Sequence, residues 1–186
     1  MQTKTSRLDI VQYPAQVLRK KAAPVDRVTP EMAYFVEEMA ELMYASNGVG
    51  LAAPQVGISL RIIVVDIGDG LQELINPVIV SREGSQTGAE GCLSLPGLYG
   101  DVERADRIVI RGLNRLGKKI TLAGEGYWAR AMQHETDHLD GKLFTDLVIP
   151  ESVHWVTGDT DSSGELIERA ASLEEALRFF ESKAAK

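Results

Sequence analysis

Cysteine and net positive charge are both scarce in this sequence. Its one cysteine, Cys92, excludes an internal disulfide and suggests a reducing compartment. Acidic residues outnumber basic ones by 27 to 20, and the resulting formal charge of -7 gives no general attraction to phosphate backbones or anionic lipids. We therefore expect no direct binding to DNA.

Long apolar segments are also missing. No stretch approaches the ~20 apolar residues that a membrane-spanning helix needs, and the first residues, MQTKTSRLDI, do not form a charged start followed by an apolar stretch. We expect a cytoplasmic protein that does not enter a membrane. Hydrophobic residues nevertheless make up 44% of the chain, which is enough for one domain of 186 residues to build a core.

Two segments have the spacing and end signals of helices. Thr29 and Pro30 are typical of a helix start, and the apolar residues that follow recur every three or four positions. This pattern predicts a helix from about 30 to 46. A second helix is expected from about 125 to 139, where Gly141 ends it.

Strands dominate the middle of the chain. Segments rich in Ile and Val, separated by short turns that contain glycine, predict two pairs of neighbouring strands at 61–67, 74–81, 107–113 and 118–122. Because short turns join neighbouring strands, the sheets should be mainly antiparallel or mixed.

The residues after Pro150 differ in composition. The stretch 157–164 is small and polar, as in a loop or linker. Residues 165–184 return to helical spacing, with Ser172 and Glu175 as a capping box inside the run. The expected fold is therefore α+β, with sheets packed around a central helix, an N-terminal helix, and a linker and C-terminal helical extension.

The pentapeptide His134-Glu135-Thr136-Asp137-His138 lies in the predicted central helix. Residues four apart share one helix face, so both imidazoles can reach one divalent cation while Glu135 lies beside its open coordination position. Such a site performs metal-assisted hydrolysis. Without a third ligand, however, a pentapeptide of this kind more often belongs to an amphipathic surface helix.

A third protein ligand must come from elsewhere in the chain. The position of a metzincin-type third histidine is occupied by Phe144, which excludes that type of site. Three downstream carboxylates are poorly placed as ligands. Glu151 follows the end of the helix, and Glu165 and Glu168 follow the linker. Cys92 is the remaining candidate and offers sulfur, a softer donor atom. The small residues beside it permit a close approach to a metal.

Three separated segments together resemble peptide deformylase: GVGLAAPQ at 48–55, EGCLS at 90–94 and QHETDHLDG at 133–141. Their order and spacing are specific, and the resemblance covers roughly residues 10 to 150. It implies a bacterial-type cytoplasmic enzyme that removes the N-formyl group from the terminal methionine of newly synthesised polypeptides and releases formate. Residues 1–150 would form the catalytic domain. Residues 151–186 would form a linker and a C-terminal helical extension of the same domain.

The resemblance also implies a metal centre and a proton carrier. Cys92, His134 and His138 would bind one divalent ion per chain, usually Fe2+ in this family, with Zn2+, Ni2+ or Co2+ able to substitute. A metal-bound hydroxide would attack the formyl carbonyl, and Glu135 would shuttle the proton.

Further roles follow from the same resemblance. The side-chain amide of Gln55 and the backbone N–H of Leu93 would stabilise the oxyanion. Backbone groups around Val49-Gly50 and Gly91 would pair with the substrate as an added strand. Glu90 would pair with Arg104 beside the site. The methionine pocket would be formed by Val49, Tyr127, Arg130, Ala131 and His134.

The expected partners are N-formyl-methionyl peptides and nascent chains. Some members of this family use a C-terminal helix for transient ribosome contact, but residues 165–186 carry five acids and four bases, which does not favour strong docking on RNA. Two alternatives remain: another metallopeptidase with the same pentapeptide, and a catalytically silent module with a structural metal. Against the second, closed structural sites use four protein ligands. His154 is interpreted as a structural or surface residue.

Overall fold

The computed structural model describes residues 8–160, 164 and 166–185. Within these residues the fold is α+β, with three α-helices and nine strands. The helices are α1 (Pro30–Ala45), α2 (Gly126–Leu139) and α3 (Leu173–Ala184). The strands are β1 (Gly50–Ala52), β2 (Ile62–Val65), β3 (Gln72–Glu83), β4 (Gln86–Cys92), β5 (Leu95–Arg104), β6 (Arg107–Leu113), β7 (Lys119–Glu125), β8 (His154–Thr160) and β9 (Leu166–Ala170).

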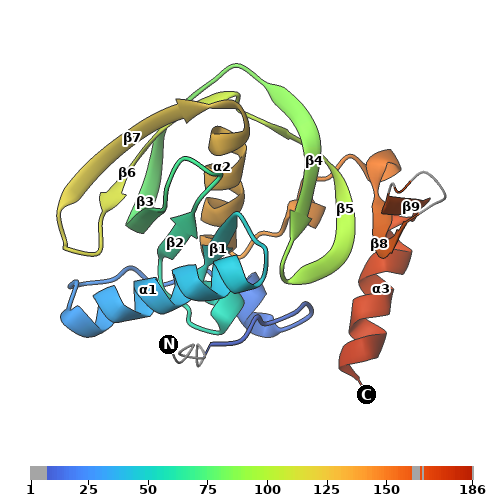
Figure 1. Cartoon of the computed structure of the whole chain (residues 1–186), viewed down its shortest axis with the longest axis horizontal. Coiled ribbons are helices and arrows are strands. Elements are labelled where there is room, and N and C mark those ends of the chain that lie inside the picture. The colour runs from blue at the N-terminus through green and yellow to red at the C-terminus, as the bar shows by residue number, and fades with distance from the viewer. Residues whose placement is uncertain (1–7, 161–163, 165, 186) are drawn as a thin grey trace.

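The strands form two sheets, and α2 lies between them (Figure 1). One sheet has the order β1-β2-β3-β6-β7 and the other β4-β5-β8-β9. Neighbouring strands are antiparallel throughout both sheets. The four strands expected from the Ile and Val segments are β2, β3, β6 and β7, so that prediction is confirmed.

Helix α1 begins where the sequence predicts. The Met32 N–H donates to Thr29 Oγ1 at 3.3 Å, and Pro30 occupies the first turn, where it costs no intrahelical hydrogen bond. The apolar face of α1 packs on β1 and β2 and buries Val36, Met39, Ala40 and Met43. No helix among the described residues is both long and apolar enough to cross a membrane.

Helix α2 is buried on almost every side. It contacts strands β1, β2, β3, β6 and β7 of the five-stranded sheet, and Ala129, Met132 and Leu139 join the core there. Ten of the eleven residues from Ala129 to Leu139 are buried, including charged and polar ones. Buried polar groups need partners, so the fold must supply them to this helix.

Strands β4 and β5 form a hairpin that the apolar pattern did not predict. Both strands contain glycines and polar residues, which have low β-propensity. The glycines admit close neighbours instead: a Cβ on Gly100 would come within 2.5 Å of Val148 Cγ2. Close packing against other segments therefore compensates for weak local preference.

The structure corrects two expectations for the C-terminal segment. The helix expected from residue 165 begins only at Leu173, because residues 166–170 form β9 and pair with β8. The polar stretch 157–164 is also no simple linker, since β8 continues through Thr160. Residues 161–163 and 165 lie outside the described residues. Ser172 instead caps α3, and its Oγ accepts the Glu175 N–H at 3.2 Å, as the capping box predicts.

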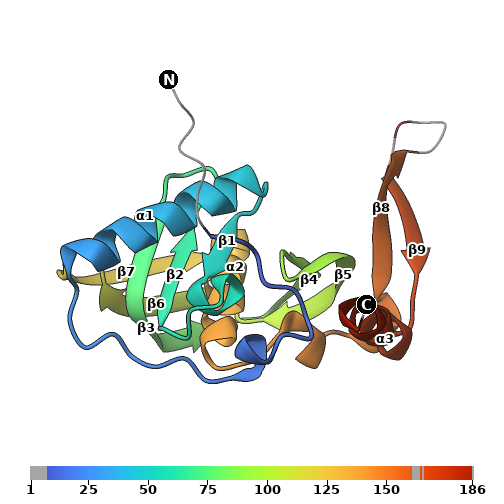
Figure 2. The same ribbon diagram turned by 90° about the horizontal axis from the view of Figure 1, so that it is seen from below.

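The C-terminal strands and helix pack on the outer side of β5. Figure 2 shows β8 and β9 extending away from the rest of the molecule, with α3 at their base. The buried side chains of Ala176 and Phe180 on α3 join a core with Leu95 and Leu98 of β5. Helix α3 therefore holds the hairpin formed by β8 and β9 against the β4–β5 hairpin.

Candidate active site and metal centre

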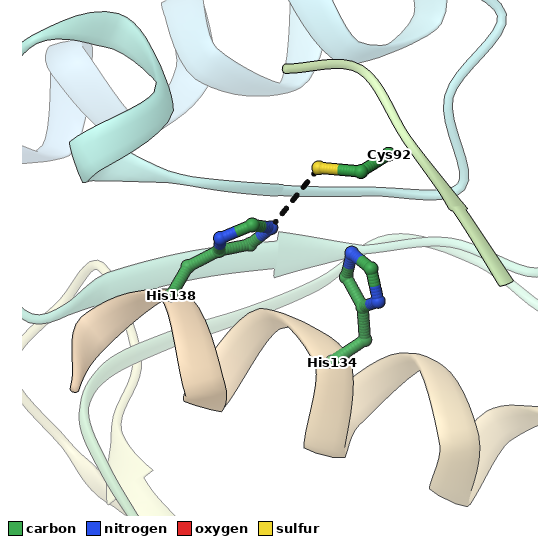
Figure 3. Close-up of side chains that lie close together, drawn as sticks. All are labelled: Cys92, His134 and His138. Atoms are coloured by element: carbon green, nitrogen blue, oxygen red, sulfur yellow. Dashed lines mark hydrogen bonds between the residues drawn. The ribbon is translucent and has the colours of Figure 1, made fainter. Parts of the chain in front are cut away.

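Cys92, His134 and His138 converge on one point between β4 and α2. His134 and His138 lie one turn apart on α2, and Cys92 approaches them from the end of β4 (Figure 3). One ligand atom from each residue lies within 4.8 Å of the other two, and Cys92 Sγ is 3.4 Å from His138 Nε2. Three donors of this kind can bind one divalent ion.

The chemistry of the donors fits a catalytic transition-metal site. One thiolate and two imidazoles suit zinc, iron, nickel or cobalt rather than magnesium or calcium. Three protein ligands leave a position for water or substrate, as catalytic sites require. A buried oxygen beside them, Glu135 Oε2, has no hydrogen-bond partner among the described residues. An oxygen in that position is free to bond a water molecule or a substrate.

Glu90 holds the first of these histidines in place. Its carboxylate accepts a hydrogen bond from His134 Nδ1 at 2.8 Å, which leaves Nε2 of the ring for a metal. The ion pair predicted with Arg104 is present, with bonds of 2.9 Å from Nε and 3.0 Å from Nη2. Arg130 Nη1 adds a third cationic donor at 2.8 Å.

This network sets the charge of Glu90. Burial would raise the pKa of this carboxyl, but hydrogen bonds from His134 and Arg104 outweigh burial and lower the pKa to about 2. Arg104 also bonds the carboxylate of Asp137 on α2. The contacts of Glu90 with His134 and Arg130 were not predicted, although Arg130 and His134 stand four residues apart on one helix face, which is the signal that could have found them.

The two histidines have opposite proton affinities. Burial would lower the pKa of His134, but interactions with Cys92 and Glu90 raise it well above its ordinary value. Burial and the adjacent His134 lower the pKa of His138 well below its ordinary value. Without a metal, one proton is therefore held on His134, and metal binding must displace it.

Glu135 is buried, and the charges of His134 and Arg104, which favour its ionised form, do not outweigh this burial. Burial raises the pKa of its carboxyl to about 7. The side chain extends toward β1, where a Cβ on Gly50 would overlap the carboxylate. Gly50 therefore makes the space that Glu135 occupies. A carboxyl that titrates near neutral pH can both accept and donate a proton.

The amide of Gln55 is oriented by its own oxygen. The side chain is 1% exposed, and Oε1 accepts the Ala52 N–H at 2.9 Å. The opposite end, Nε2, then faces Cys92 Sγ and Ser94 Oγ, each at 3.3 Å. An amide N–H donor thus lies directly beside the candidate metal ligand.

A cleft of about 450 Å³ opens over these groups. All residues predicted for the oxyanion and for substrate binding line it, as do Cys92, His134 and Glu135, whereas His138 lies behind the surface of the cleft. Other lining residues were not predicted for the site, among them Pro96, Gly97 and Tyr99, which follow the Cys92 segment. These residues belong to the unpredicted β4–β5 hairpin or its turn, which explains why they were missed.

Comparisons with known proteins all identify the same family. The family model described as polypeptide deformylase matches residues 7–153. A peptide deformylase from Acetivibrio thermocellus is 55% identical over 134 residues, which cover 72% of this chain and 79% of that protein. Another from Desulfitobacterium hafniense is 50% identical over 137 residues, covering 74% and 91%.

Solved structures agree with these sequence relatives. The crystal structure of peptide deformylase from Thermotoga maritima superposes with a TM-score of 0.75 and 42% identity, covering 77% of this chain and 98% of that one. The family-model match ends at residue 153. Strands β8 and β9 and helix α3 lie beyond it.

Proposed function

The chain belongs to the peptide deformylase family of metallohydrolases, and we propose that it removes the formyl group from the N-terminal formyl-methionine of new polypeptides, releasing formate. The observation that carries this proposal is the convergence of Cys92, His134 and His138 within 4.8 Å beside the unpartnered Oε2 of Glu135. Two of the three proposed ligands and the proposed proton carrier thus line one cleft.

We assign the metal to Cys92, His134 and His138, with Fe2+ as the native ion and Zn2+, Ni2+ or Co2+ as substitutes. When bound, a divalent ion supplies a Lewis acid that lowers the pKa of a water molecule toward neutrality. Glu90 contributes indirectly, because its bond to Nδ1 fixes the ring of His134 and its charge is balanced by two arginines.

Glu135 carries the proton in this proposal. With a pKa of about 7, the carboxylate can accept a proton from the attacking water and return it to the amine that leaves. Its burial supports this role, since a solvated glutamate would stay ionised and would be a poor acid at neutral pH.

Gln55 and Leu93 stabilise the developing charge on the formyl oxygen. The bond from Ala52 N–H to Oε1 fixes the Gln55 amide so that Nε2 serves as a preorganised donor. The backbone N–H of Leu93 follows the ligand Cys92 directly, and Leu93 lines the cleft. Loss of one such donor typically costs about 2.7 to 4 kcal/mol of transition-state stabilisation.

Two strand edges are available to hold the peptide. In the described sheets, β1 and β4 are terminal strands, and Gly50 of β1 and Gly91 of β4 both line the cleft. A peptide in extended conformation can pair with such edges. The methionine side chain then enters between Val49, Tyr127 and Ala131.

Arg130 does not place a free charge in that pocket. Its Nη1 donates to Gly88 O, Glu90 Oε1 and Val102 O at 3.0, 2.8 and 2.9 Å. With the guanidinium held by these acceptors, the aliphatic stem is the part left for an apolar substrate side chain.

The test is formate release from a formyl-Met-Ala-Ser peptide by protein prepared anaerobically with Fe2+ or Ni2+. We expect formate and a free amine in equal amounts, and no product from the metal-free protein. The matched control is an acetyl-capped peptide of the same sequence. Cleavage of an internal peptide bond without formate would favour a metallopeptidase, and metal binding without any hydrolysis would favour a structural role.

A further inference from the structure

A row of residues crosses the four-stranded sheet from the cleft to the C-terminal hairpin. Gly91 of β4 is the cross-strand partner of Tyr99 on β5, and Tyr99 is the partner of His154 on β8. Directly opposed residues in an antiparallel pair have neighbouring side chains on the same face. The three residues therefore form one continuous line on one face of the sheet.

The contacts along this row are close. A Cβ on Gly91 would lie 2.5 Å from Tyr99 Cε1, so the absence of a side chain lets the tyrosine ring lie over this strand. On its other side the ring is stacked with the His154 imidazole, with centroids 6.1 Å apart and planes inclined by 22°. The imidazole is fixed in turn by Nδ1, which lies 2.8 Å from Ser152 O.

Helix α3 determines which face His154 occupies. Successive strand residues point to opposite faces, so Trp155 and His154 must face opposite sides of β8. Trp155 packs against Phe179 and Phe180 of α3, with ring centroids 5.3 and 5.6 Å apart. Docking of α3 on the Trp155 face thus leaves His154 on the face of Tyr99.

Tyr99 lies in the wall of the cleft. It is 37% exposed and lines the cleft, as does Tyr127. Tyr127 belongs to the proposed methionine pocket. Tyr99 and the proposed methionine pocket therefore belong to the wall of the same cleft.

We propose that His154 is a positioning residue for substrate binding: by stacking on Tyr99 it holds this ring against Gly91, so the C-terminal β8–β9–α3 segment shapes the peptide-binding wall of the cleft. The proposal rests on the proposed deformylase function. His154 lies just beyond the residues that the family model matches, whereas Gly91 and Tyr99 lie within them.

The test compares kcat and KM for formate release from formyl-Met-Ala-Ser by wild-type, His154→Ala and His154→Phe proteins. His154→Ala should raise KM about two- to tenfold, the range expected for loss of one aromatic stack, with kcat changed less than about twofold. His154→Phe keeps a planar ring and should restore KM. Glu168→Ala, an exposed change on β9, is the matched control and should behave as wild type.

A double-mutant cycle with Tyr99→Ala identifies the route of the effect. If His154 acts through Tyr99, His154→Ala should change KM no further in the Tyr99→Ala background. An unchanged KM in His154→Ala, no rescue by phenylalanine, or an equal effect without Tyr99 overturns the inference. Absence of formate release by the wild-type protein would instead overturn the proposed function and the inference with it.

Discussion

Glu90 and Glu135 line the same cleft and are buried to the same degree, each 5% exposed. Glu90 accepts hydrogen bonds from His134, Arg104 and Arg130, whereas Oε2 of Glu135 has no partner among the described residues. The pKa of Glu90 is lowered to about 2 and that of Glu135 is raised to about 7. Surroundings, rather than residue type, fix one carboxyl as an anion and leave the other with a pKa near neutrality, as the proposed role of proton carrier requires.

The difference has a structural origin. Glu90 lies on β4 and faces helix α2 and β5, from which arginines reach it. Glu135 lies on α2 and points toward β1, where Gly50 provides space but no charge. The following experiments change one side of this contrast at a time.

The largest effect is expected from Glu135→Gln. The amide cannot carry the proton, so formate release should fall about 10²- to 10⁴-fold, the usual contribution of general acid–base catalysis. Metal content, measured by mass spectrometry, should not change, because the metal ligands remain. Turnover close to that of the wild type would remove Glu135 from the mechanism.

Glu90→Gln should act on the fold and the metal instead. Loss of this charge leaves Arg104 and Arg130 buried without their shared anion, so the free energy of unfolding should fall by about 3–5 kcal/mol in urea titrations. Metal affinity should drop about 10- to 100-fold, because the His134 ring loses its acceptor. Glu103→Gln on β5 is the exposed control. Equal effects of the two variants would contradict a structural role for Glu90.

The pH dependence of stability should separate the same two groups in metal-free protein. Glu135 has a folded pKa above its ordinary value of 4.5, so its ionisation should reduce stability as pH rises from about 4.5 to 7. A shift of this size amounts to about 3 kcal/mol. Glu90 has a lowered pKa, so its contribution is present above pH 4.5 and lost as pH falls toward 2.

The comparison of wild type with Glu135→Gln isolates the first of these terms. The free energy of unfolding of the variant minus that of the wild type should grow between pH 4.5 and 7 and then level off. A difference that stays constant across this range would show that Glu135 titrates as an ordinary surface carboxyl.

The smallest effect is expected from Asp137→Asn. Asp137 is the second partner of Arg104, but its side chain is 21% exposed and Glu90 keeps its bidentate bond to the same guanidinium. Stability should fall by only about 1 kcal/mol, and metal affinity should be unchanged. A loss as large as that of Glu90→Gln would mean that Arg104 needs both acids.

Part of the fold and of the candidate site could be predicted from the sequence. The helices near 30–46 and 125–139 were predicted correctly because caps and apolar spacing agree there with the tertiary contacts. The residues predicted to bind substrate or stabilise the oxyanion followed from the resemblance to a family, and the structure places them in one cleft. Their catalytic and metal-binding roles remain proposals.

The rest depended on long-range contacts that leave weak local signals. Strands β4 and β5 were missed because glycines fill positions where other segments pack closely, as at Gly91 and Gly100. Strand β9 was mistaken for helix because Leu166, Ile167 and Ala170 also fit a helical spacing. The backbone acceptors of Arg130 could not be located from the sequence, because the unpredicted strands β4 and β5 supply them.

The most direct test of the account is a metal titration of the metal-free protein. Under anaerobic conditions, Ni2+ is added in steps while formate release from formyl-Met-Ala-Ser is followed, in parallel for wild type and Cys92→Ser. Activity should rise until one ion per chain is bound in the wild type, and Cys92→Ser should retain the metal far more weakly. Full formate release without metal, or wild-type metal retention by Cys92→Ser, would contradict it.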